Sequence, residues 1–332
     1  MRFPKQIKAI YISNFGAPET LQLKNRTLNA PKPNEITIKI KACGINGPDI
    51  LQRNGFYQPT KQNAKWLGLE VSGEIAFVGE KAGNWKIGDK VVALCNGGAY
   101  ANYVNVPFGQ VLPLPKNWSF IEGAALPETF FTIYQTLIMK AKLKKNMSVL
   151  IHGASGGIGA SAIQISKLIG AKVICCVSSK IKADYVKSLG ADYIINYKQQ
   201  DYVEEVLKIT NGEGVDRVID VVGGTYLKRN IKAAAHGATI IQLAFLGGAK
   251  AEINIAPILL KNLTIFGSTL GPKNSQIKAK IAKGLKEKIW PALNEGKIKA
   301  QHIRSFKLKE ATKAHHAFEA SKHFGKIILV VD

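Results

Sequence analysis

The sequence predicts an α/β protein of two domains, a β-rich domain at the start of the chain and a doubly wound parallel-sheet domain in the middle. Short apolar runs separated by glycine-rich turns fill the first hundred residues, which is typical of a β-barrel or sandwich. From about residue 123, apolar runs alternate with helical patterns, which is typical of βαβ units around a parallel sheet. The length of 332 residues suits two domains of ordinary size.

The first domain shows the alternation of a half-buried strand. Ile36, Ile38 and Ile40 are separated by threonine and lysine, which predicts a strand with one buried face. A further apolar strand is expected at 91–94. Turn-like sequences separate such runs, namely NGPD at 46–49, KAGN at 81–84, KIGD at 86–89 and CNGG at 95–98.

The middle of the chain alternates between strand and helix patterns. Apolar residues from Ile158 to Ile169 recur at spacings of 4, 3 and 4, which predicts a helix that Gly170 ends. A second helix ends near residue 190, and a third lies near 202–209. Strands are expected at 148–152, 172–177, 194–197, 217–222, 238–244 and 263–268.

The last part of the chain combines a helix with a strand. Apolar residues at 277, 281, 285 and 289 predict a long amphipathic helix, and 326–331 is a strand-like apolar run. We expect this C-terminal part to rejoin the first domain. The resulting boundaries are 1–122 with 268–332 for the first domain and 123–267 for the second.

Composition excludes several classes of protein. A hydrophobic content of 46% with 21% charged residues excludes a disordered chain, and no apolar run approaches the roughly 20 residues of a membrane span. The N-terminus has no apolar signal segment, and the four cysteines show no disulfide framework. We therefore expect a protein of the cytoplasm.

The net charge of +23 raises the question of nucleic-acid binding. Only six of the 46 basic residues are arginine, the side chain that phosphates and bases favour, and the lysines are spread along the whole chain. The densest basic stretch lies in the helical segment 273–288. We interpret the charge as a solvated lysine-rich surface that gives only weak, salt-sensitive binding to polyanions.

A glycine-rich segment at 152–159 lies between a predicted strand and a predicted helix. Its frame A-x-G-x-x-G resembles the dinucleotide fingerprint, in which a helix N-terminus and close backbone approach hold the pyrophosphate. The alternative is a purely structural glycine turn. We expect a dinucleotide to be bound by Ala154, Ser155, Gly156, Gly157 and Ile158.

The end of the next strand indicates which dinucleotide binds. An NAD site needs a carboxylate about 20 residues after the loop to bind the ribose hydroxyl. Here the chain reads VSSKIK at 177–182, with no acid before Asp184. Ser179 and Lys182 would hold a 2′-phosphate by charge-assisted hydrogen bonds, which indicates NADPH. The alternative is a solvated start of a helix.

The sequence offers no metal site and no nucleophile. No histidine precedes His152, no C-x-x-C spacing occurs, and Cys43 and Cys95 stand alone, so a Cys/His zinc site is not expected. A G-x-S-x-G elbow is also missing. The remaining chemistry is hydride transfer by a bound cofactor.

Seven short segments together resemble one known family. The chain is similar to the zinc-independent quinone oxidoreductases of the medium-chain dehydrogenase/reductase superfamily, in the zeta-crystallin-like branch, from about residue 7 to its end. The segments lie at 41–49, 67–73, 88–91, 124–127, 154–159, 189–191 and 325–327. The resemblance implies a GroES-like catalytic domain, a Rossmann domain and a homodimer.

The resemblance also implies roles for individual residues. The zinc-dependent relatives have a cysteine and a histidine ligand where this chain has Asn46 and Leu69. Matching positions imply that Asn46 and Asp49 line the nicotinamide end, that Tyr57 contacts substrate, and that Ser179, Lys182 and Tyr197 form the 2′-phosphate pocket. Further implied cofactor contacts are Thr129, Phe245, Leu246 and Lys326.

Several of these residues have simpler interpretations. Asn46 and Asp49 suit the cap of a turn or helix. Tyr57 could belong to the surface of the barrel and Tyr197 to an ordinary strand. The adjacent Cys175 and Cys176 are expected to be core residues, since neighbouring strand side chains point to opposite faces. The chain also departs from many relatives at 267–272, where an arginine is missing, so cofactor contacts there stay open.

The combined interpretation is an NADPH-dependent oxidoreductase that reduces quinones or related conjugated carbonyls by direct hydride transfer without a metal. An NADPH-dependent enoyl or alkenal reductase is the nearest alternative, and an RNA-binding zeta-crystallin-like protein is a more distant one. We expect the strand at 263–267 to form the edge of the central sheet, which favours pairing with a second copy of the chain.

Overall fold

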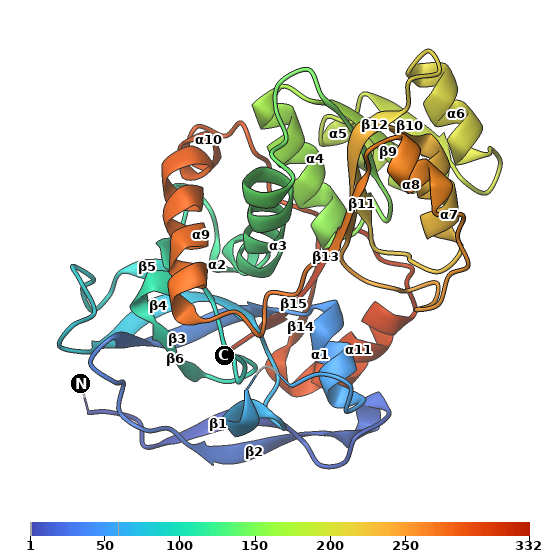
Figure 1. Ribbon diagram of the computed structural model, residues 1–332. Helices are drawn as coiled ribbons and strands as arrows, with labels where there is room; N and C mark the ends of the chain where they lie inside the picture. The colour runs from blue at the N-terminus through green and yellow to red at the C-terminus, as the bar shows by residue number, and fades with distance from the viewer. Residues whose placement is uncertain (1, 59) are drawn as a thin grey trace. The chain divides into compact units, whose positions relative to one another are not determined.

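A computed structural model describes residues 2–58 and 60–332 (Figure 1). Contacts between residues separate the chain into two compact units. The first contains Met1–Phe131, Gly271–Gly296 and Ala300–Asp332, and the second contains Thr132–Leu270 and Lys297–Lys299. The first boundary lies after residue 131 instead of 122 and the second after residue 270 instead of 267, and residues 297–299 group with the second unit, which the sequence did not predict.

The first unit is built on antiparallel β-structure. A seven-stranded sheet has the order β14-β15-β3-β4-β5-β7, with β6 paired to β3, and a hairpin of β1 and β2 accompanies it. The bounds are β1 Gln6–Ile12, β2 Leu21–Thr27, β3 Glu35–Gly44, β4 Glu70–Val78, β5 Lys90–Leu94, β6 Tyr103–Pro107, β7 Val111–Pro113, β14 Ile303–Lys307 and β15 Lys326–Val330.

Helices and short turns complete this unit. The helices are α1 Gly47–Arg53, α2 Phe120–Gly123, α3 Pro127–Ile133 (which runs into the second unit), α9 Ser275–Lys288, α10 Trp290–Asn294 and α11 Ala311–Glu319. Single 3-10 turns occupy Pro18–Thr20, Lys61–Asn63, Phe108–Gln110 and Leu308–Glu310.

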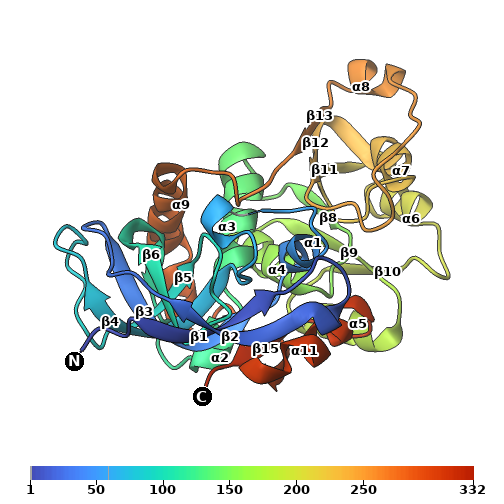
Figure 2. The ribbon, with the colours of Figure 1, turned by 90° about the horizontal axis from the view of Figure 1, so that it is seen from below.

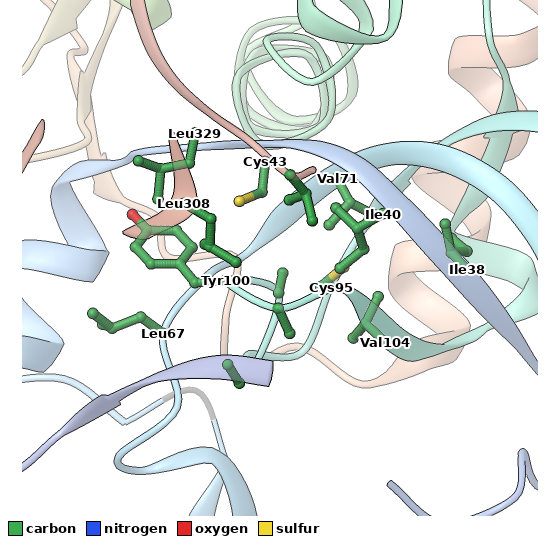
Figure 3. Close-up of a cluster of buried hydrophobic side chains, with 14 of the residues drawn as sticks. Ile38, Ile40, Cys43, Leu67, Val71, Cys95, Tyr100, Val104, Leu308 and Leu329 are labelled. Carbon is green, nitrogen blue, oxygen red and sulfur yellow. The ribbon is translucent and has the colours of Figure 1, made fainter. Parts of the chain in front are cut away.

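The core of the first unit follows from the predicted alternation. Ile36, Ile38 and Ile40 of β3 are almost completely buried, which confirms the expected strand. Apolar side chains of the seven-stranded sheet and of the β1–β2 hairpin belong to one hydrophobic cluster. Figure 3 shows part of this cluster, including Ile38 and Ile40 of β3. The C-terminal strand closes this structure, because Leu329 of β15 pairs antiparallel with Cys43 of β3.

The second unit contains the predicted parallel sheet. Six strands lie in the order β10-β9-β8-β11-β12-β13, and every pair is parallel. Figures 1 and 2 show α4 and α5 on one face of this sheet and α6, α7 and α8 on the other. The strands are β8 Ser148–Ile151, β9 Lys172–Val177, β10 Tyr193–Asn196, β11 Val215–Asp220, β12 Ala234–Gln242 and β13 Thr264–Gly267.

Three helices of the second unit, α4, α5 and α6, lie where the sequence predicts, and α7 and α8 were not predicted. The bounds are α4 Gly157–Ile169, α5 Lys180–Ser188, α6 Tyr202–Ile209, α7 Tyr226–Ala233 and α8 Ala256–Leu260, and a π-helical turn at Tyr134–Lys140 follows α3. Gly170 ends α4 with a φ of 85°, a conformation that favours glycine. Asp201 caps α6 by accepting hydrogen bonds from Val203 N and Glu204 N.

Two expectations about local structure are wrong. The NGPD segment is not a simple turn, because Asn46 is the N-cap of α1 and the helix starts at Gly47. In α9, Ile277 is 42% exposed, and Lys278 takes the buried position instead. Asn274 caps that helix, and this fixes its rotation so that residues 278, 281, 282 and 285 face inward.

Within residues 2–58 and 60–332, no helix combines the length and the apolar composition that crossing a bilayer needs.

Candidate functional site

In the second unit, predicted cofactor residues lie in the loops at the carboxyl ends of the parallel strands. Carboxyl ends of parallel strands meet at the same edge, and ligands of such sheets bind where the strand order reverses. Here β8 and β11 are the neighbours at the reversal. The loops that follow β8, β9, β10 and β12 carry Gly156, Ser179, Tyr197 and Phe245 respectively.

The glycine-rich loop forms a cradle at the start of α4. Gly156 is the N-cap residue, and its N–H donates to Gly153 O at 3.0 Å. A Cβ placed on Gly156 would have only Gly153 O near it, at 3.5 Å, so the space beside this backbone is open. A Cβ on Gly159 would overlap the backbone of Ala154, so this glycine lets the helix pack against the loop. The loop therefore fits a pyrophosphate.

A surface pocket of about 420 Å³ lies at the ends of β9 and β10. It includes the predicted Ser179, while Lys182 and Tyr197 are not among the residues that line it. Its lysines are Lys180 and Lys198, and no carboxylate belongs to the lining. The lining residues are Ser178, Ser179, Lys180, Ala183, Asn196, Lys198 and Gln199.

The other predicted contacts at this edge occupy an exposed loop. Phe245 is 55% and Leu246 is 82% exposed, so both apolar side chains face away from the core. The loop is fixed by backbone hydrogen bonds from Leu246 N to Val221 O and from Gly247 N to Val222 O. It therefore adjoins the segment that follows β11 at the strand reversal.

The second unit also contains a buried polar network around Asn230, which the sequence analysis did not predict. Asn230 Nδ2 donates to Asp220 Oδ2 at 2.9 Å, so Asn230 Oδ1 accepts from His152 Nε2 at 2.7 Å and from Tyr202 OH at 3.0 Å. Burial lowers the pKa of His152, which keeps the imidazole neutral. Asp220 Oδ1 also accepts from Val222 N at 2.6 Å. The network thus joins the ends of β8 and β11.

In the first unit, the predicted Asn46 and Asp49 stabilise the start of α1. Asp49 is fully buried, and its carboxyl accepts hydrogen bonds from Asn46 N at 2.8 Å and Gly68 N at 3.1 Å. Burial raises the pKa of Asp49 to about 7, although these hydrogen bonds act in the opposite direction. The simpler interpretation of the two residues, as a helix cap, agrees with this geometry.

Lys326 and Glu70 form a buried ion pair next to Asn46. The Lys326 ammonium donates to Glu70 Oε1 at 2.5 Å, to Asn46 Oδ1 at 2.7 Å and to Ile45 O at 3.1 Å. Glu70 Oε1 also accepts from Asn46 Nδ2 at 2.8 Å. All three ammonium donors are thereby used, which leaves none for the cofactor contact that the resemblance implies for Lys326.

Glu128 adds a second buried carboxyl to this cluster. Its backbone N–H donates to Glu70 Oε2 at 2.9 Å, and the residue is only 8% exposed. Within the described residues, its own carboxyl has no hydrogen bond. Burial and the neighbouring Glu70 carboxylate raise the pKa of Glu128 to about 8.

Tyr57 and Lys278 meet at Gly271. Lys278 Nζ donates to Gly271 O at 3.1 Å and to Asn96 Oδ1 at 2.7 Å, and burial lowers the pKa of this lysine. A Cβ on Gly271 would overlap the Tyr57 hydroxyl, so the phenol lies directly over this glycine. Burial raises the pKa of Tyr57, and the carboxylates of Glu128 and Asp49 act in the same direction.

The last predicted cofactor residue of this unit, Thr129, is buried in α3. Its hydroxyl lies within hydrogen-bond distance of Ala125 O and Leu126 O, at 3.2 and 3.3 Å. Among the described residues, no group of three or more His, Cys, Asp or Glu is placed to hold a metal ion. The positions of the implied zinc ligands, Asn46 and Leu69, hold an amide and an apolar side chain.

In the first unit, Glu70, Glu128 and Lys278 are site residues that the sequence analysis did not identify, and in the second unit Lys180 and Lys198 of the pocket are others. Glu128 stands in the otherwise apolar segment ALPETFF, and such an isolated carboxylate is a signal that could have found it. Lys278 carries no comparable signal, because it is one of many lysines in its helix.

Two family models match parts of this chain. Residues 32–116 match the family model of the alcohol dehydrogenase GroES-like domain, and residues 157–284 match that of zinc-binding dehydrogenases. The mouse quinone oxidoreductase is 30% identical over 333 residues, which cover 98% of each chain.

Two solved structures of oxidoreductases are similar to this chain over almost its whole length. The quinone oxidoreductase of Escherichia coli, solved in complex with NADPH, is 30% identical with a TM-score of 0.83, over 97% of this chain and 99% of that one. The CurK enoyl reductase is 28% identical with a TM-score of 0.85, over 99% of this chain and 100% of that one.

Fold and site together define an oxidoreductase of the medium-chain dehydrogenase/reductase superfamily, with a GroES-like unit and a Rossmann-like unit. Within this superfamily, the chain belongs to the quinone oxidoreductases.

Proposed function

We propose that the protein uses NADPH to reduce quinones or related conjugated carbonyls by direct hydride transfer without a metal. The observation that carries this proposal is the combination of an open glycine cradle at the start of α4 with a lysine- and serine-lined pocket at the next strand end. The four free, buried cysteines suit a reducing compartment, and we propose the cytoplasm.

The second unit would hold the cofactor. Gly156 and the first turn of α4 would bind the pyrophosphate, and Ser179 with Lys198 would bind a 2′-phosphate. Phe245 and Leu246, in the loop after the carboxyl end of β12, present exposed apolar surface that suits the nicotinamide. When bound, the reduced cofactor supplies the hydride. The first unit would position the acceptor and exclude water from it.

Steady-state turnover tests this function. The protein, dialysed against a strong chelator, is assayed with NADPH and with NADH against a panel of quinones and of α,β-unsaturated carbonyls. We expect quinone reduction with NADPH to survive the dialysis, and elemental analysis to find well under one zinc per chain. Turnover that disappears on dialysis and returns with zinc would contradict the metal-free proposal.

An enoyl or alkenal reductase is the second candidate. The likeness to the CurK enoyl reductase favours it, because the proposed cofactor site would serve a carbon–carbon double bond as well. The same panel decides between the two, since the preferred acceptor is the one with the higher kcat/KM.

The pocket predicts which residues select NADPH. We expect Lys198→Ala to weaken NADPH binding by about tenfold to a hundredfold, the value of about 1.5–3 kcal/mol for one charge-assisted contact, and to leave NADH nearly unchanged. Lys182→Ala tests the position that the sequence indicates but that does not line the pocket. Fluorescence titration measures the Kd of each variant for NADPH and for NADH, and Lys187→Ala, at an exposed position, is the control. Equal binding of NADPH and NADH by the unmodified protein would contradict the assignment.

The edge of the parallel sheet predicts a homodimer. β13 ends the sheet, so within residues 2–58 and 60–332 one side of its backbone has no partner strand, and Leu259 and Leu260 of the preceding α8 are 77% and 73% exposed. Pairing of β13 with its symmetry mate would satisfy these groups and cover apolar surface. Light scattering at micromolar concentration should give about twice the chain mass of 36.1 kDa. A mass of one chain would contradict the proposed dimer.

A further inference from the structure

Reduction of a carbonyl acceptor requires a proton in addition to the hydride. The residues that the family resemblance implies near the acceptor are Asn46, Asp49 and Tyr57, and burial raises the pKa of the Tyr57 phenol, which therefore gives up its proton less readily than a carboxylic acid. Asp49 is fully buried with its two oxygens bound to backbone N–H groups, and both ends of the Asn46 amide are bound to Lys326 and Glu70. A carboxylic acid without hydrogen-bond partners would therefore be a better proton source than any of these three residues.

Glu128 combines a fixed backbone with a carboxyl that makes no hydrogen bond among the described residues. Its backbone is fixed by the hydrogen bond from its N–H to Glu70 Oε2, and Glu70 is in turn held by Lys326. Its own carboxyl has no hydrogen bond among the described residues, although the residue is 8% exposed. A buried carboxyl without partners is an unusual arrangement, because burial of an unpaired charge is costly.

The surroundings of Glu128 allow both protonation states. The charged groups that act on it come from four elements: Glu70 on β4 and Asp49 on α1 oppose ionisation, while Lys326 on β15 and Lys278 on α9 favour it. Tyr57, whose hydroxyl lies over Gly271, is electrostatically coupled to the same carboxyl. Cys95 also lies within electrostatic reach.

We propose that Glu128 is the proton donor of the reduction, an inference that rests on the proposed function. The acceptor gains the hydride from the reduced nicotinamide at one end of its conjugated system, and the π electrons move to a carbonyl oxygen. That oxygen takes the proton of the Glu128 carboxylic acid, the carboxyl O–H bond breaks, and an O–H bond forms on the product. Glu128 is left as a carboxylate beside Lys278 and Lys326, and water returns its proton.

The rate of turnover tests this role. Glu128→Gln keeps the shape and removes the proton, so we expect kcat to fall by about a hundredfold, the lower end of what general acids contribute. The unmodified protein should lose activity as the pH rises through the pKa of Glu128, and this limb should disappear in Glu128→Gln. Glu128→Asp should restore part of the rate together with the limb. Glu80→Gln, an exposed position with the same chemical change, is the control.

Two measurements do not depend on turnover. An infrared difference spectrum between the unmodified protein and Glu128→Gln at pH 7 should contain the C=O band of a protonated carboxyl. The pKa of Glu128 is raised on folding, so its contribution to stability is lost as the pH rises from about 4.5 to about 8. The fall of Tm over this range should therefore be smaller in Glu128→Gln.

The outcomes separate the two proposals. If the unmodified protein reduces neither quinones nor enones, the proposed function fails. If it does reduce them and Glu128→Gln keeps the same rate and pH profile, the inference about Glu128 fails and the proposed function stands. An infrared spectrum that shows an ionised Glu128 at pH 7 would also overturn the inference.

Discussion

Gly156→Val should abolish dinucleotide binding while leaving the protein folded. Gly156 has a φ of −81° and a ψ of 176°, an extended conformation that any residue adopts, so glycine is not needed here for its backbone freedom. A Cβ would meet only Gly153 O, at 3.5 Å, which is an ordinary contact. The valine side chain would instead occupy the space of the pyrophosphate, and the unmodified melting temperature should be retained.

Gly159→Val should reduce the stability of the fold as well as the binding of the cofactor. A Cβ at this position would overlap the backbone of Ala154, so α4 must move away from the strand–loop junction that it covers. We expect a loss of stability of about 1–3 kcal/mol, the usual cost of overpacking, in addition to weaker binding.

Thermal melts with and without NADPH distinguish the two variants. At a ligand concentration of about 100 times Kd, the unmodified protein should gain about 2.7 kcal/mol of stability. Gly156→Val should melt normally and gain nothing, and Gly159→Val should melt early. A Gly156→Val protein that still gains stability from NADPH would show that this loop does not hold the cofactor.

Lys326→Met should strongly destabilise the first unit. It removes the ammonium that binds Glu70 and Asn46 and leaves a carboxylate uncompensated in the interior, where Glu70 is 0% exposed. Breaking a buried pair from one side typically costs about 3–5 kcal/mol, which for a unit of this size lowers Tm by about 6–20 °C.

A double variant shows whether the charge causes the loss. Glu70→Gln combined with Lys326→Met removes both charges and still offers an acceptor to Glu128 N, so it should recover a large part of the stability. Lys322→Met, at an exposed position nearby in sequence, should change Tm little. If Lys326→Met costs less than about 1 kcal/mol, the buried pair is not what stabilises this cluster.

The loop and strands of the second unit were predictable because their signals are local. The segment at 152–159 lies between a short apolar strand and a helix with apolar residues at regular spacing, and the structure has β8 and α4 there. Cys175 and Cys176 are 0% and 1% exposed, which confirms their expected place in the core of β9. Strand and helix periodicities depend on residues a few positions apart, and a single sequence shows them directly.

The first unit shows what the sequence alone could not decide. Lys326 pairs with Glu70 across 256 positions, and Lys278 reaches Asn96 across 182 positions. Nothing local distinguishes these two lysines from the other lysines of the chain. Whether a charged side chain is buried depends on which distant strands and helices surround it, because only a packed interior excludes water and supplies the partner. The sequence by itself therefore determined the two-domain α/β fold, the glycine cradle and the absence of Cys and His at the implied zinc positions. Only the tertiary structure decided that Lys326, Lys278 and Glu128 form one buried cluster of titratable side chains.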